Sequence, residues 1–219
     1  MTYPDKITSA VKRLNSILPL AKRQQSLDAS LKNVHQKILY SYIERGRSLT
    51  KNEMAHWVED IDASIKILQD NDLVVFDTSG EPRGAYPFTM EARDHIVTVN
   101  NHSVHCMCAL DALAVSPMFN LSTVISSRCH VTQASIIIHQ QGLAIQNSDE
   151  LLDVCFGINW NAASDNSCCA DSLCAEMVYL KGKTVELNWL SEAVDYRQTF
   201  RLNEAVEFSA RFFVPLISE

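Results

Sequence analysis

A thiol and a carboxyl stand three residues apart in this chain, at Cys108 and Asp111. Residues at that spacing lie on one face of a helix, so the two side chains are expected next to each other. If the helix begins near Cys106 or Met107, the amides of its first turn favour the thiolate form of Cys108. A thiolate is the form that binds soft metal ions, so the pair predicts metal chemistry with an acid beside it.

A second group of thiols is found at Cys168 and Cys169. Asp165 and Asn166 precede them and could cap another helix, which would give Cys168 the same electrostatic help. The separation from Cys108 is too long for a local zinc knuckle, so only the fold could bring these thiols together.

All seven cysteines fall within residues 93–219. The first residues lack the apolar core of a secretory signal, and no apolar run approaches the roughly 20 residues that span a bilayer. We therefore expect a cytoplasmic protein without a membrane partner, with thiols kept for metal binding or catalysis rather than disulfides. Taken singly, Cys129 and Cys155 are expected to be packing residues, because cysteine is often buried.

A zinc site built from histidine is the other metal chemistry to consider. The histidines at positions 102, 105, 130 and 139 show no familiar ligand spacing with one another or with the cysteines. We expect them to be structural or surface residues.

Residues 1–92 read as an N-terminal, winged-helix-like helical segment. Apolar residues at helical spacing predict a helix ending before Gly46, and Thr50 with Glu53 predicts a capping box for the next one, with Met54, Trp57 and Val58 as its apolar face. A third helix is predicted over 60–72, followed by a hairpin of 73–76 and 83–88. No helix is assigned before Leu31.

A winged helix raises the possibility of DNA binding, but the charges oppose it. The helix over 60–72 would be the recognition helix, and it carries four aspartates against the single Lys66. The whole chain has 26 acidic residues against 19 lysines and arginines, a net charge of −7. We expect no nucleic-acid partner and interpret the segment as a cover over the catalytic part.

Residues 93–219 are predicted to form the catalytic α+β domain that holds the cysteine site, a mixed β-sheet with flanking helices. With 47% hydrophobic residues over 219, the chain can bury a large core. The predicted strands are 96–99, 121–126, 135–139, 143–146 and 154–160, and the predicted helices are 107–118, 185–193 and 203–213.

The motif Cys-Ala-Leu-Asp at 108–111 resembles that of the organomercurial (alkylmercury) lyases. Ser126-Ser127-Arg128-Cys129 is similar to the family's second cysteine turn, and Ser167-Cys168-Cys169 resembles its second catalytic cysteine with its neighbour. The likeness extends over most of the chain from about Val34.

This resemblance implies an enzyme that breaks carbon–mercury bonds by protonolysis, giving a hydrocarbon and Hg(II). Cys108 and Cys168 would bind the mercury, with Cys169 a further candidate ligand, and Asp111 would deliver the proton as a general acid. Such an acid needs an apolar setting that raises its pKa, which Ala109 and Leu110 can provide. The reaction would need no cofactor. External thiols would assist turnover, and mercuric reductase or cellular thiols would accept the Hg(II).

Two other functions fit some of the same residues. A winged-helix sensor could bind a soft metal through Cys106, Cys108 and the 168–169 pair and change its affinity for an operator. A relative that keeps the thiols as a mercury scavenger without turnover is a third hypothesis. The roles of Cys106, Cys169 and Cys174 stay open at this level.

Overall fold

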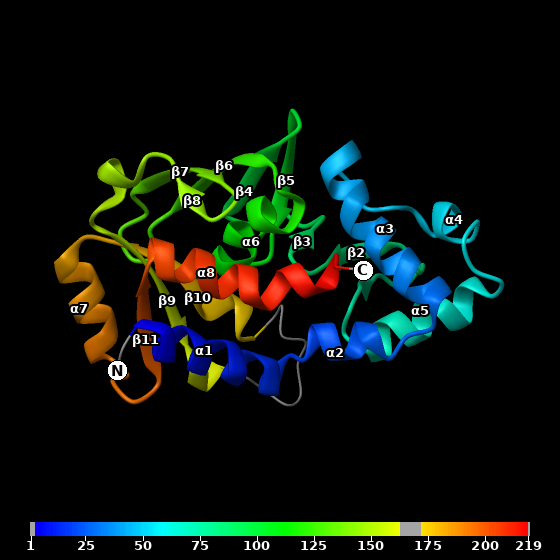
Figure 1. Ribbon diagram of the computed structural model, residues 1–219, viewed down its shortest axis with the longest axis horizontal. Helices are drawn as coiled ribbons and strands as arrows, with labels where there is room; N and C mark the ends of the chain where they lie inside the picture. The colour runs from blue at the N-terminus through cyan, green and yellow to red at the C-terminus, as the bar shows by residue number, and fades with distance from the viewer. Residues whose placement is uncertain (1–2, 163–171, 219) are drawn as a thin grey trace.

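An eight-stranded antiparallel sheet and a separate three-stranded sheet enclose one central helix in the computed structural model, which describes residues 3–162 and 172–218 (Figure 1). The elements run in the order α1 Tyr3–Ile17, α2 Leu20–Gln25, α3 Ala29–Arg45, α4 Lys51–Met54, α5 Ile61–Asp70, β1 Val75–Phe76, β2 Pro82–Ala85, β3 Phe88–Thr89, β4 His95–Val99, β5 His102–Cys106, α6 Ala109–Phe119, β6 Ser122–Arg128, β7 Ser135–Gln141, β8 Ala144–Ile145, η1 Ser148–Leu151, β9 Val154–Asn159, η2 Trp160–Ala162, η4 Cys174–Glu176, β10 Met177–Lys181, α7 Lys183–Ser191, β11 Arg197–Arg201, α8 Leu202–Phe213 and η5 Val214–Leu216. The predicted α+β class is confirmed.

The large sheet has the strand order β1-β2-β3-β5-β4-β6-β7-β8. Strand β7 alternates strictly between exposed and buried residues, as a strand with one solvated face should. Its buried residue Ile138 pairs with Ile125 of β6, so both side chains point toward α6. The hairpin predicted at 73–76 and 83–88 forms as β1 and β2, and β3 joins β2 to β5, so the N-terminal segment continues directly into this sheet.

Helix α6 is apolar on every side, which is typical of a helix buried within a core. It contacts α8, β10 and strands β4 to β7. Pro117 lies inside the helix and has no amide to offer the carbonyl of Leu113. The side chain of Gln140 donates to that carbonyl at 3.0 Å instead. The central helix is thus fixed to the sheet near its C-terminal end.

The smaller sheet has the order β10-β9-β11, with all pairs antiparallel. Helix α8 lies between α6 and α1 (Figure 1). Its buried face carries Phe208, Phe212 and Phe213, and the last two reach the residues of α6.

Strands β10 and β11 were not predicted, and neither was β5.

The first two helices also escaped prediction. Helix α1 buries Ile7, Ala10 and Leu14 at helical spacing against α8. Helix α2 buries Gln24, whose side-chain amide donates to the carbonyl of Leu216 at 2.8 Å. The N-terminal residues therefore pack on the C-terminal end of the chain.

The predicted capping box is confirmed, since the Thr50 side chain accepts from the Glu53 amide and Glu53 accepts from the Thr50 amide. The predicted apolar face is confirmed only in part, since Met54 is buried and Val58 packs against the core, but both Trp57 and Val58 lie beyond the end of the helix and Trp57 is exposed. Helix α4 ends at Met54 because the chain must turn to reach Asp60, which caps α5. Trp57 is 48% exposed, with the Lys37 ammonium 3.8 Å from its ring centre.

No helix within residues 3–162 and 172–218 is long and apolar enough to cross a membrane.

Candidate active site

Cys108 is the N-cap residue of α6, which begins at Ala109. The start predicted at Cys106 or Met107 is wrong, because β5 keeps the chain extended through Cys106 and the Met107 amide donates to the Pro87 carbonyl. The Cys108 thiol takes the place usually held by a hydroxyl or carboxylate cap. It accepts from the backbone amide of Asp111 at 3.4 Å.

Asp111 is the third residue of α6 and only 1% exposed. Because α6 is buried on all sides, its first turn has no polar surface for the carboxyl to reach. Neither carboxyl oxygen has a hydrogen-bond partner of standard geometry among the described residues. Burial raises the pKa of Asp111 to about 7, while the side chain and backbone of Cys108 act to lower it. The raised pKa expected from the apolar sequence is therefore present.

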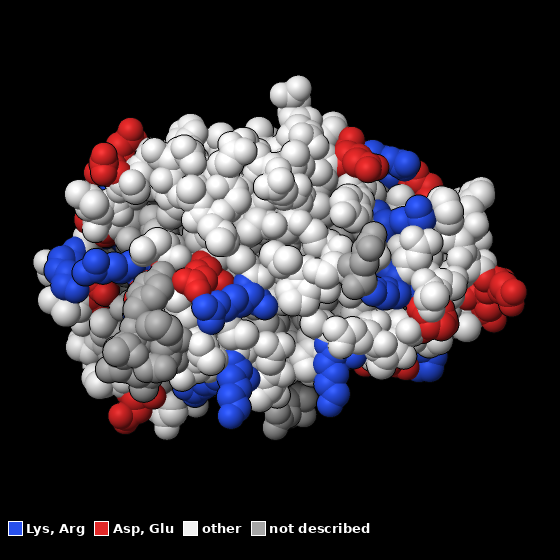
Figure 2. Space-filling model, viewed as in Figure 1, with Lys and Arg blue, Asp and Glu red and all other residues white. Residues whose placement is uncertain are grey.

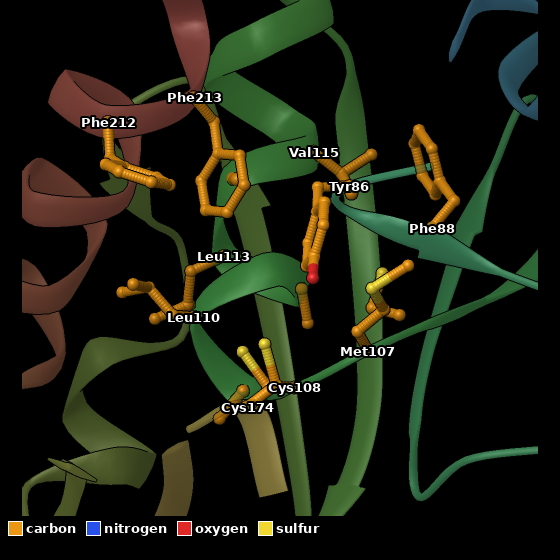
Figure 3. Packing of buried hydrophobic residues seen from close by; sticks show 14 of the residues in the cluster. Tyr86, Phe88, Met107, Cys108, Leu110, Leu113, Val115, Cys174, Phe212 and Phe213 are labelled. Atoms are coloured by element: carbon orange, nitrogen blue, oxygen red, sulfur yellow. The ribbon is translucent and has the colours of Figure 1, made fainter. Parts of the chain in front are cut away.

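The second thiol beside Cys108 is that of Cys174. One possible ligand atom from each of Cys108, Asp111 and Cys174 lies within 4.8 Å of the others, and all three residues are buried. Figure 3 shows the sulfur atoms of Cys108 and Cys174 side by side below α6. The predicted partners Cys168 and Cys169 lie outside the described residues. No feature of the sequence marked Cys174, rather than Cys168 or Cys169, as the second thiol of the site.

Cys174 reaches the site through the one-turn helix η4, which leads directly into β10. Strand β10 contacts both α6 and β9. Tyr179 of this strand donates its hydroxyl hydrogen to the Ala109 carbonyl at 2.9 Å, and burial raises the pKa of that hydroxyl well above its usual value. This hydrogen bond ties the strand that follows Cys174 to the first turn of the helix that carries Asp111.

The surroundings of Cys108 disfavour the thiolate that the sequence predicted. Burial raises the pKa of Cys108 to about 12, and the charge of Asp111 acts in the same direction. A hydrogen bond between the side chains of Cys108 and Cys174 opposes this rise, as does the amide of Asp111. The single helix amide is too weak to offset complete burial, so desolvation outweighs the activating effect that the sequence predicted for Cys108.

The structure also describes Cys106, Cys129 and Cys155, and none of them belongs to this group of three possible ligands. Cys106 is buried on β5, and burial raises the pKa of its thiol well above the usual value. Cys155 packs in a small cluster with Trp189. Cys129 follows the last residue of β6, and its sulfur accepts from the Lys181 amide at 3.3 Å, which connects the turn after β6 to β10. Its place indicates a structural role.

Two of the four histidines considered as zinc ligands bond to the backbone. His102 bonds to the Glu44 carbonyl and His105 to the backbone of Arg93, while His95 bonds to the Ser127 hydroxyl and packs on Tyr179. Within the part of the chain that the structure describes, no histidine belongs to a group of three possible metal ligands.

Two buried thiols and a carboxyl that holds a proton near neutral pH can bind a soft metal ion and protonate a group attached to it. This chemistry is that of a class of enzymes that act on soft metals, and the buried group of Cys108, Asp111 and Cys174 is suited to it. The family model of alkylmercury lyase matches residues 88–214, more than half of the chain. The chain belongs to the alkylmercury lyase family.

A solved structure has the same fold. It is the mercury-bound form of a protein called MerB2, with a TM-score of 0.73 and 16% sequence identity, and the match covers 96% of this chain and 100% of that one. Among curated proteins, none matches the chain.

Proposed function

We propose that this lyase cleaves the carbon–mercury bond of organomercurials with Cys108 and Cys174 as the mercury ligands and Asp111 as the proton donor. The observation that supports this assignment is the buried cluster of these three residues. Thiolates are the preferred ligands of Hg(II), and two of them are the minimum needed to hold the product after the carbon has left.

The reaction begins with exchange of one ligand. The Cys108 sulfur binds R–Hg⁺, and the thiol proton leaves with the previous ligand of the mercury. The pKa of about 12 does not prevent this step, because the metal replaces the proton on sulfur. The product is a Cys108–Hg–R adduct inside a dry site.

The second thiol supplies both a ligand and a proton. As the Cys174 sulfur binds the mercury, its proton passes to the Asp111 carboxylate, which can hold it near neutral pH because burial raises the pKa of Asp111 to about 7. Two sulfur donors increase electron density on the carbon. Asp111 protonates that carbon, the C–Hg bond breaks, and the hydrocarbon leaves. Hg(II) stays on two thiolates, and the Asp111 carboxylate can accept the next proton.

Nothing in these steps requires a cofactor. Release of Hg(II) requires other thiols, because only a ligand of similar softness competes with two cysteines. Cellular thiols or a mercuric reductase in the cytoplasm would fill that role, and excess external thiol should be needed for repeated turnover.

A metal-responsive DNA-binding protein is the competing function, and the surface charge does not favour it. On α5, Lys66 is paired with Asp70 at 2.9 Å, while Asp62 is largely exposed. Figure 2 shows blue and red groups intermingled on the face it presents, without a continuous basic tract. A gel-shift assay with Hg(II) present should show no operator binding.

The decisive experiment follows benzene release from phenylmercury in excess small thiol, with Hg(II) measured in parallel. Cys174→Ser and Cys108→Ser should each abolish benzene release, and Cys155→Ser is the matched control at a buried cysteine that packs elsewhere. Loss of turnover in Cys168→Ser with full activity in Cys174→Ser would instead assign the second ligand to Cys168.

A further inference from the structure

We infer that Met177 is a third sulfur ligand of this site, whose thioether binds the Hg(II) held by Cys108 and Cys174. The inference rests on the proposed function and adds to it a ligand of a different chemical class. It concerns the product state, in which the organic group has left and the mercury has a free coordination position.

The contact that carries the inference joins Met177 to Cys108. The Cys108 thiol donates to the Met177 thioether at an S–S distance of 3.6 Å. Met177 is 3% exposed, so the thioether has no alternative contact with solvent. The thiol proton of Cys108 points at the Met177 sulfur. A metal ion that replaces this proton would therefore come into contact with both sulfur atoms.

The local backbone places Met177 beside Cys174 as well. The two residues are three apart across η4, and the Met177 amide donates to the Cys174 carbonyl at the end of this 3₁₀ turn. Cys174 is the first residue of η4 and Met177 is the first residue of β10, directly after it, so one short segment brings both sulfur atoms to Cys108.

The chemistry suits a soft ion. A thioether is a neutral, polarizable donor that prefers soft metals over zinc or magnesium. Because it carries no proton at neutral pH, its binding releases none and leaves the proton balance of the cleavage unchanged. It also adds no negative charge to a site that already contains two thiolates and Asp111, which a third thiolate would do. Met177 would therefore lengthen retention of Hg(II) without competing for the proton that Asp111 delivers.

The test uses Met177→Leu, a change that keeps the volume of the side chain and removes the sulfur. Met54→Leu, at a buried methionine in α4, is the matched control. Each reduced protein is loaded with one equivalent of inorganic Hg(II), and the metal is then withdrawn by titration with a small dithiol. We expect Met177→Leu to lose Hg(II) at a roughly tenfold lower dithiol concentration, the lower end of what loss of a supporting group at a metal site costs.

A second measurement reports the ligand directly. The protein has six methionines, and labelling their methyl carbons gives one NMR signal for each. The signal absent from Met177→Leu should move on addition of Hg(II), while the Met54 signal should stay in place.

An unmoved Met177 signal on a protein that has bound Hg(II), together with equal retention by Met177→Leu and wild type, would overturn the inference and leave the lyase proposal intact. Failure of the wild type to bind Hg(II) at all would instead refute the proposed function.

Discussion

Asp111→Asn should stabilise the metal-free protein, by an amount that depends on pH. The wild-type carboxyl has a pKa of about 7 in the folded chain against 3.8 for the ordinary side chain. At about 1.4 kcal/mol for each pH unit, ionising it inside the fold costs on the order of 4 kcal/mol of unfolding free energy. Asparagine has a similar shape and cannot ionise, so the variant avoids this cost.

The sign of the effect follows from proton binding. Below about pH 4 the carboxyl is protonated in the folded and the unfolded chain, so it adds no pH dependence there. Between about pH 4 and pH 7 only the folded chain keeps the proton, and wild-type stability falls as the pH rises. Above about pH 7 the full cost is present. The advantage of Asp111→Asn should therefore grow from acid to neutral pH and then level off.

Urea unfolding of both proteins, reduced and free of metal, gives the unfolding free energy at a series of pH values from about 4 to about 8. Asp149→Asn removes an exposed carboxylate and is the control for general charge effects. A free-energy difference between Asp111→Asn and wild type that does not change with pH would refute the argument. So would a wild type that gains stability toward pH 8 relative to the variant.

Two further substitutions test how the site is held. Tyr179→Phe removes the 2.9 Å hydrogen bond to the Ala109 carbonyl and should lower the unfolding free energy by about 1 kcal/mol, measured by urea titration. An unchanged urea midpoint would show that this hydrogen bond does not stabilise the packing of β10 on α6. Gly84→Ala would place a Cβ 3.0 Å from the Phe88 carbonyl oxygen, and relief requires backbone movement in β2 and β3. We expect a cost of about 1–3 kcal/mol and a lower melting temperature, and an unaltered melting curve would show that the strands shift freely.

The local half of the site could be predicted from the sequence. Cys108 and Asp111 are three residues apart, and helix geometry alone places them together. The long-range half could not. Cys174 meets Cys108 only because β10 contacts α6, and β10 itself was not predicted. Its residues are nearly all buried, so they show no alternation of polar and apolar side chains.

The prediction that Cys108 is a thiolate was wrong for a related reason. The mostly apolar sequence of α6 indicates a buried helix, but it does not show which distant elements cover the N-terminus of that helix. Desolvation depends on all the elements that cover a group, and α8 and β10 cover this one from distant parts of the chain. The direction of the Asp111 pKa was predictable, since its apolar neighbours are its own helix residues, and here the local and global environments agree.

The burial of Cys108 and Cys174 also determines which reagents can damage this site. Peroxides and alkylating agents attack the thiolate, and a cysteine that keeps its proton and lies 1% exposed reacts with them slowly. A mercurial needs no thiolate beforehand, because it displaces the proton itself. The resting protein should therefore survive oxidative conditions that inactivate enzymes with exposed, ionised cysteines, and remain able to react with mercury when both stresses occur together.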